Sequence, residues 1–156
     1  MFQKYLLIFL VSMVPLIELR GAIVMAVGME LDYMTSLVVC VLGNMLPVPL
    51  VYFFARKVLI WGVNLRFVGK FFRFCLEKGE KAGRKLTADA GRGGLFVALM
   101  LFVGIPLPGT GAWTGTLAAS FLNMGIKSTA ASVSLGVLMA GVIMGIASTG
   151  VFSVIG

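Results

Sequence analysis

The two ionisable residues Glu18 and Arg20 interrupt a stretch of the chain, residues 5–29, that carries no other charge. A charged side chain at the depth of a lipid bilayer is costly, and such residues usually pair with each other or line a pathway. A carboxylate in this setting could take up and release a proton, with a neighbouring cation stabilising its charged form. We therefore predict that Glu18 is a proton-coupling residue and that Arg20 is its partner. A static ion pair that fixes this part of the chain is the structural alternative.

A second group of candidate residues lies around residue 110 and carries no charge. Residues 105–111 read IPLPGTG, and two prolines and two glycines in so short a segment break a helix. The backbone amides that open the following helix form the positive end of a dipole, which suits an anion or a carbonyl oxygen. Thr110 and Thr114 add hydroxyl groups, and Trp113 could stack on a substrate or pack against a neighbour.

Asn44 is a third candidate, because it precedes a pair of prolines inside an apolar segment. Pro47 and Pro49 each remove a helical hydrogen bond, which predicts a helix kink and frees carbonyl groups. The Asn44 side chain could satisfy such a group or contact a substrate. The proton-coupling and substrate site is thus predicted to contain Glu18, Arg20, Asn44, Thr110, Trp113 and Thr114, with Gly21, Pro106, Pro108, Gly109 and Gly111 forming the backbone of two broken tips.

The sequence lacks the usual signatures of an enzyme or a metal site. It contains no histidine, and its two cysteines, Cys40 and Cys75, lie in an apolar and a basic segment respectively. No pairing of a nucleophile with a base and no phosphate-binding loop is recognisable. We therefore predict that the protein is not an enzyme and uses no metal or cofactor.

These candidate residues are embedded in a chain that has the composition of an integral membrane protein. Of its 156 residues, 60% are hydrophobic and 12% are charged, and the mean hydropathy is +1.05. A soluble domain has about 25% charged residues. The uncharged segments 35–55 and 128–156 are long enough for membrane-spanning helices, which need roughly 20 residues each.

Two other apolar segments are broken in the middle, and their arms are too short to cross a bilayer. The first, residues 5–29, is broken at residues 18–21, and the second, residues 93–126, at residues 106–111. An arm of about 13 residues reaches about 20 Å, whereas the hydrocarbon core is roughly 30 Å thick. Each segment is therefore predicted to be a re-entrant hairpin that precedes one spanning helix. A single kinked span is the alternative for the first segment.

The resulting order predicts an all-α membrane fold of two inverted repeats, residues 1–56 and 93–156, joined by a linker at residues 57–92. Ten Lys and Arg residues against three acids lie between residues 56 and 92, which marks the linker as cytoplasmic. Its position between membrane segments argues against nucleic-acid binding. Arg66, Lys70 and Arg73 fall on one face of a predicted amphipathic interfacial helix, where they would contact anionic lipid headgroups.

Three motifs closely resemble those of the small multi-drug export proteins, a bacterial and archaeal membrane family. They are ELRGAI at residues 18–23, GN followed by two prolines at residues 43–49, and PLPGTGAWTG at residues 106–115. This resemblance covers nearly the whole chain. The family is distantly similar to the DedA superfamily, whose members pair re-entrant hairpins with spans and are implicated in lipid-carrier translocation and proton-coupled export. DedA proteins carry arginines around their second hairpin, whereas residues 93–126 contain none here.

The resemblance implies a multi-pass protein of the prokaryotic plasma membrane. Together with the residues above, it leads to the hypothesis of a proton-coupled exporter of an amphipathic cation or a lipid-linked anion. A lipid scramblase or flippase, in which Arg20 would meet a phosphate, is one alternative. A non-transporting subunit that organises the membrane is another. A homodimer is plausible for so small a chain.

Overall fold

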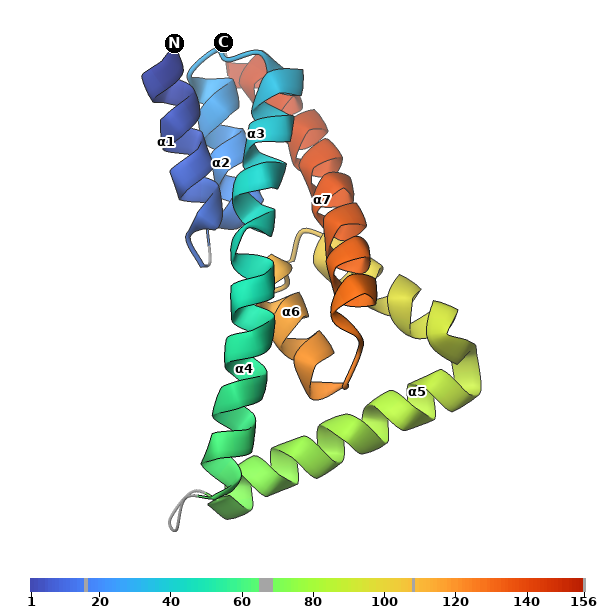
Figure 1. Cartoon of the computed structure of the whole chain (residues 1–156). Coiled ribbons are helices and arrows are strands. Elements are labelled where there is room, and N and C mark those ends of the chain that lie inside the picture. The colour runs from blue at the N-terminus through green and yellow to red at the C-terminus, as the bar shows by residue number, and fades with distance from the viewer. Residues whose placement is uncertain (16, 65–68, 108, 156) are drawn as a thin grey trace.

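Helices and short connections make up the described part of the chain, which comprises residues 1–15, 17–64, 69–107 and 109–155 of this computed structural model. No strand occurs in these residues, so the predicted all-α class is confirmed. Arg66 and Pro108, which the sequence singled out, lie outside the described residues. The helices are α1 (Phe2–Met13), α2 (Glu18–Gly28), α3 (Tyr33–Met45), α4 (Pro47–Val63), α5 (Gly69–Gly104), α6 (Ala112–Phe121) and α7 (Ile126–Ile155), as Figure 1 shows.

The first hairpin turns earlier than the sequence pattern predicted, because Pro15 ends α1. Val14 has the extended backbone (φ −73°, ψ 128°) that a following proline favours. The turn therefore lies before Glu18, and the expectation of a tip at Glu18–Gly21 is wrong, since these residues form the first turn of α2. Glu18 itself has a φ of 52°, which residues other than glycine rarely adopt.

The first long apolar segment folds as two successive helices, α3 and α4. Asp32 caps the N-terminus of α3, and its carboxylate accepts hydrogen bonds from the hydroxyl and amide of Thr35 at 2.6 and 2.8 Å. These bonds lower the pKa of Asp32 below its usual value. The helix is interrupted at Leu46, directly before Pro47, because a proline has no N–H with which to continue the hydrogen-bond pattern. α4 then extends further toward the linker than the sequence predicted.

Helix α5, which consists of two helical pieces on either side of a kink, joins the basic linker to the second hairpin. Within it Gly91 departs from helical backbone angles (φ 70°, ψ 178°), a conformation open to glycine because it has no side chain. The N-terminal part of α5 leads away from the end of α4, and after the bend the C-terminal part packs against α7 (Figure 1). α5 then ends at Gly104, and α6 begins at Ala112, so the second break falls where the sequence placed it.

The two hairpins open toward opposite ends of the molecule, and their turns meet in its middle (Figure 1). α1 packs against α2 and α3, and α2 packs against α7. In the second half, α5 packs against α7, and α6 packs against α4. The helices next to the two turns are therefore packed against α3, α4 and α7.

Large apolar side chains point outward from the longer helices. Leu42, Phe54 and Ile146 are examples of exposed residues on α3, α4 and α7. Soluble monomers rarely expose apolar surface on this scale. Among the described residues, two helical segments are long and apolar enough to cross a membrane, Tyr33–Val63 and Ile126–Gly150. The structure thus supports the prediction of an α-helical membrane protein.

The packing of α5 against α7 depends on Gly136, which yields a first prediction. A Cβ atom at this position would lie 2.6 Å from the carbonyl oxygen of Met100 and 2.8 Å from Cβ of Val103. We expect Gly136→Ala to lower the free energy of unfolding by about 1–3 kcal/mol, because an overpacked helix interface must separate. Unfolding of the purified protein in detergent measures this effect. Gly125→Ala, where a Cβ meets nothing within 4 Å, is the control, and equal stability of the two variants would contradict the prediction.

Candidate functional site

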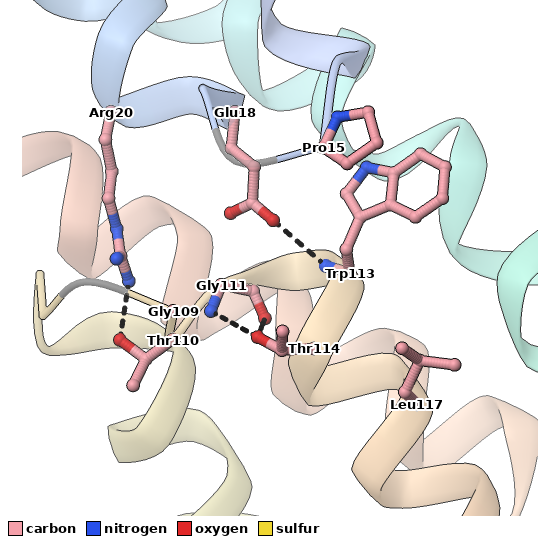
Figure 2. A pocket seen from close by; sticks show the side chains of 9 residues that line it. All are labelled: Pro15, Glu18, Arg20, Gly109, Thr110, Gly111, Trp113, Thr114 and Leu117. Carbon is pink, nitrogen blue, oxygen red and sulfur yellow. Dashed lines mark hydrogen bonds between the residues drawn. The ribbon is translucent and has the colours of Figure 1, made fainter.

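The Glu18 carboxylate caps the N-terminal end of α6 in the second hairpin. Its oxygens accept hydrogen bonds from the backbone amides of Ala112 and Trp113 at 3.1 and 3.2 Å, and Figure 2 shows the bond to Trp113. The Glu18 side chain is only 7% exposed. The first amides of a helix have no partner within the helix and carry the positive end of its dipole. A negatively charged carboxylate is therefore stabilised at this position.

Arg20 occupies the opposite side of the same break, where α5 ends. Its guanidinium donates hydrogen bonds to the carbonyl oxygens of Val103 and Ile105, at 3.1 and 3.2 Å, and to that of Leu107. It also donates to the hydroxyl oxygen of Thr110 at 3.0 Å (Figure 2). The last carbonyl groups of a helix lack partners and carry the negative end of the dipole, so a cation is stabilised there.

Glu18 and Arg20 therefore each complement one end of a helix that is broken between α5 and α6. The sequence predicted that Glu18 and Arg20 are partners. In the structure the hydrogen bonds of the two side chains go to different groups. The reason is geometric, because residues two positions apart in a helical turn do not face each other. Both charges satisfy backbone groups from the other half of the chain, and this holds the two turns together.

An open pocket of about 190 Å³ lies beside this junction. The predicted side chains that line it are those of Glu18, Arg20, Thr110, Trp113 and Thr114, and Gly109 and Gly111 contribute backbone (Figure 2). The structure thus brings together residues from both halves of the chain. The pocket combines one carboxylate, one guanidinium and an indole ring.

Other predicted residues lie away from this pocket. Asn44 is 2% exposed and lines a separate cavity of about 10 Å³ among α2, α3, α5 and α7, which Glu18 also borders. Gly21, Pro106, Pro47 and Pro49 line neither cavity. Pro47 and Pro49 instead lie in the first turn of α4, beside the interruption of the long helix.

Comparison with known proteins identifies a family whose sequence model matches this chain. The sequence model of one protein family, described as “putative small multi-drug export protein”, matches residues 18–143. The chain belongs to this family. The family match begins at Glu18 and includes both helices of the second hairpin, so it contains every polar residue of the junction. The description of the family names an export protein, which agrees with the two helical segments that are long and apolar enough to cross a membrane. No curated protein and no solved structure matches the chain.

Sequence reasoning missed the contributions of the turn that precedes the family match. Pro15 of this turn supplies an apolar wall to the pocket, and Leu117 of α6 supplies another. The indole N–H of Trp113 donates a hydrogen bond to the carbonyl oxygen of Met13, at 3.2 Å, and so ties α6 to the end of α1. Pro15 carried a usable signal, because the residue before a proline tends to leave the helical conformation. The partner of Trp113 had no such signal, since it is a backbone oxygen far away in the sequence.

Thr110 and Thr114 have structural roles in the turn of the second hairpin. The hydroxyl of Thr110 bridges Arg20 to the carbonyl oxygen of Ile105, to which it donates at 2.9 Å. The hydroxyl oxygen of Thr114 accepts a hydrogen bond from the amide of Gly111 at 2.9 Å. Both threonines therefore satisfy backbone groups that the break in the helix leaves without partners.

Gly111 keeps space free for the Glu18 carboxylate, which yields a second prediction for this member of the export family. A Cβ atom on Gly111 would lie 1.8 Å from Oε2 of Glu18. Because this oxygen ends a flexible side chain, we expect Gly111→Ala to displace the carboxylate from the α6 amides while the fold persists. Amide NMR shifts of Ala112 and Trp113 would report the displacement. Unchanged shifts would contradict it, and Gly93→Ala, where a Cβ meets nothing within 4 Å, is the control.

Proposed function

We propose that this chain exports small amphipathic cations in exchange for protons and that Glu18 is the residue that couples the two. The observation that carries the proposal is the position of its carboxylate, which is buried, is bound to the α6 amides and borders an open pocket. Among the acidic side chains that the structure describes, Glu18 is the only buried one. A buried ionisable group that borders a pocket in a membrane protein is a natural proton carrier.

The hydrogen bonds of the junction favour a cationic substrate over an anionic one. The guanidinium of Arg20 already donates to four oxygen atoms of the second turn. The carboxylate of Glu18 accepts one amide at each oxygen and has lone pairs left over. The ring of Trp113 offers a second group that attracts a cation. The lone pairs that remain on Glu18 and the ring of Trp113 therefore favour a cation over the headgroup phosphate that a lipid flippase would bind.

The size of the pocket limits how much of a substrate it can receive. Its volume of about 190 Å³ is below the range of roughly 300–1,000 Å³ that is usual for sites enclosing a drug-sized ligand. We propose that the charged end of the substrate enters the pocket beside Glu18. The apolar remainder would then extend past Pro15 and Leu117 toward the lipid.

Protonation of Glu18 provides a mechanism for coupling. A neutral carboxyl group loses its attraction to the N-terminal end of α6 and carries a hydrogen that the α6 amides cannot accept. The contact between the two turns would weaken, and a bound cation would lose its counter-charge. Release of the proton would restore the contact and the affinity for the next cation. Substrate and proton would thereby compete for one carboxylate.

This mechanism requires the two turns to lie at the middle of the membrane. We propose that residues 1–56 and 93–156 form two inverted repeats, each with a re-entrant hairpin and a span, and that residues 57–92 lie on the cytoplasmic side of the prokaryotic plasma membrane. α1 and α6 have 12 and 10 residues. Their lengths of about 18 and 15 Å are roughly half of the hydrocarbon thickness. The opposite openings of the hairpins support this topology (Figure 1).

The exposed cations Lys70 and Arg73 at the start of α5 suggest a lipid contact on the same side. We propose that they bind anionic headgroups, with the exposed rings of Phe71 and Phe74 entering the membrane surface. Each basic residue near an anionic surface contributes about 1 kcal/mol. We expect the double variant Lys70→Ala, Arg73→Ala to retain about 30-fold less phosphatidylglycerol in native mass spectrometry. Retention equal to that of Lys4→Ala would contradict this contact.

Reconstitution in liposomes with a pH-sensitive dye tests the proposed function. We expect amphipathic cations to dissipate an imposed pH gradient only when the protein is present. Exchange of headgroup-labelled lipid in the same vesicles, without any effect on the gradient, would instead indicate a scramblase. No activity in either assay would favour a subunit that organises the membrane.

A further inference from the structure

The side-chain amide oxygen of Asn44 is a buried hydrogen-bond acceptor without a donor. The residue is 2% exposed, and its Oδ1 atom has no hydrogen-bond partner in the described part of the chain. Buried polar atoms nearly always have partners, because an unpaired one loses its interaction with water and gains nothing in return. The acceptor on α3 therefore marks a place where a hydrogen-bond donor, from water or from a neighbouring side chain, can bind.

The cavity that Asn44 lines shows where such a donor can come from. Its volume of about 10 Å³ corresponds to about one water molecule. Glu18 and Arg20 are the charged residues that line it, and the rest of its wall is apolar side chains and backbone of α2, α3, α5, α6 and α7. The hydrogen bonds of Arg20 lead to the turn of the second hairpin. Glu18 and Arg20 thus line both this cavity and the open pocket, and of the two Glu18 is the one that can change its charge by taking up a proton from the pocket.

We propose that Asn44 accepts a hydrogen bond from Glu18 when Glu18 is protonated, either directly or through one water molecule in this cavity. The inference rests on the proposed function, because it requires Glu18 to take up a proton. A charged carboxylate only accepts hydrogen bonds, and the amides of Ala112 and Trp113 supply them. A proton that arrives from the open pocket turns one carboxylate oxygen into an O–H donor. The amides of Ala112 and Trp113 are donors themselves and cannot accept its hydrogen bond. The Oδ1 atom of Asn44 is the acceptor that borders the same cavity.

The two hydrogen-bonding states of Glu18 link different parts of the protein. The charged state joins α2 to α6, that is, the first hairpin to the second. The protonated state joins α2 to α3 within the first half of the chain and leaves the N-terminal amides of α6 free. Asn44 is therefore a positioning residue, which gives the protonated side chain a defined place while the second hairpin is released.

Infrared difference spectroscopy of the full-length protein in lipid nanodiscs tests this proposal. Lowering the pH should produce the carbonyl band of a protonated carboxyl group, and the band that is absent from Glu18→Gln belongs to Glu18. We expect Asn44→Leu, which keeps the volume but removes the acceptor, to shift this band to the higher wavenumber of an acid that donates no hydrogen bond. We also expect proton-coupled flux to fall about tenfold, as for the loss of one hydrogen bond.

Two further variants separate the possible outcomes. Thr129→Val removes another buried oxygen without a partner, at a position that does not line the cavity, and should leave the band in place. Asn44→Ala repeats the test if the leucine variant does not fold. A Glu18 band that is identical in wild type and in the Asn44 variants would overturn the role of Asn44 while leaving proton coupling intact. If no band is assignable to Glu18 at any pH, the proposed function itself fails.

Discussion

Glu18→Gln is expected to reduce proton-coupled export to the rate of protein-free liposomes while the protein remains folded. Glutamine keeps the shape of the side chain and one acceptor oxygen for the α6 amides but has no charge, so it should hold the contact between the two turns in the weakened form that protonation would give. It has no proton to exchange and no charge to attract a cation. Dissipation of a pH gradient by an amphipathic cation, followed with an entrapped dye, measures the loss.

The matched control for this prediction is Glu30→Gln, because Glu30 is an exposed acid at the open end of the first hairpin. It should transport at the rate of the wild type. Binding of the cation, measured by tryptophan fluorescence, should weaken only in the Glu18 variant, since Trp113 lines the same pocket. Transport by Glu18→Gln at the wild-type rate would rule out coupling through this residue.

Arg20→Ala is expected to have the largest effect on stability, lowering the free energy of unfolding by about 2–4 kcal/mol. The substitution removes the donor for three carbonyl groups at the end of α5 and for the hydroxyl of Thr110. In the membrane there is little water to replace it. The carbonyl oxygen of Val103 would lose this donor, and those of Ile105 and Leu107 would keep only neutral donors from the turn, among them the hydroxyl of Thr110. Thermal unfolding in detergent, monitored by helical circular dichroism, gives the measurement.

Two comparisons show whether the loss comes from the geometry of the guanidinium. Arg20→Lys keeps the charge but not the planar set of donors, so we expect it to recover only part of the stability. Lys127→Ala removes an exposed cation and should have a negligible effect. A stability of Arg20→Ala equal to that of the wild type would mean that the carbonyl groups of the turn find other partners.

These two predictions assign separate roles to charges that stand two residues apart. Glu18 should govern coupling, because its carboxyl group can gain or lose a proton without a change in the shape of the side chain. Arg20 should govern the integrity of the second turn, because its charge is permanent and its guanidinium donates to four oxygen atoms there. If Glu18 and Arg20 instead formed a static ion pair, which is the structural alternative, the effects of the two substitutions would depend on each other.

The sequence by itself determined the class of the protein and the places where its helices break. Long uncharged segments require lipid, and prolines and glycines interrupt helices through local geometry, so both can be deduced from neighbouring residues. The interruption before Pro47 and the break between α5 and α6 follow from such signals. The charges at Glu18 and Arg20 predict a turn at these residues, but the turn of the first hairpin lies before them, where Pro15 follows α1.

Only the tertiary structure decided what the charged residues contact. The partners of Glu18 and Arg20 lie 83–95 residues further along the chain. Most of these partners are backbone atoms, which every residue has, so no side-chain pattern could identify them. The unpartnered oxygen of Asn44 was likewise found only in the structure, because burial and the absence of a hydrogen-bond partner depend on tertiary packing. The two charges at residues 18 and 20 marked a site, and the ends of a helix broken elsewhere in the chain determined how each is used.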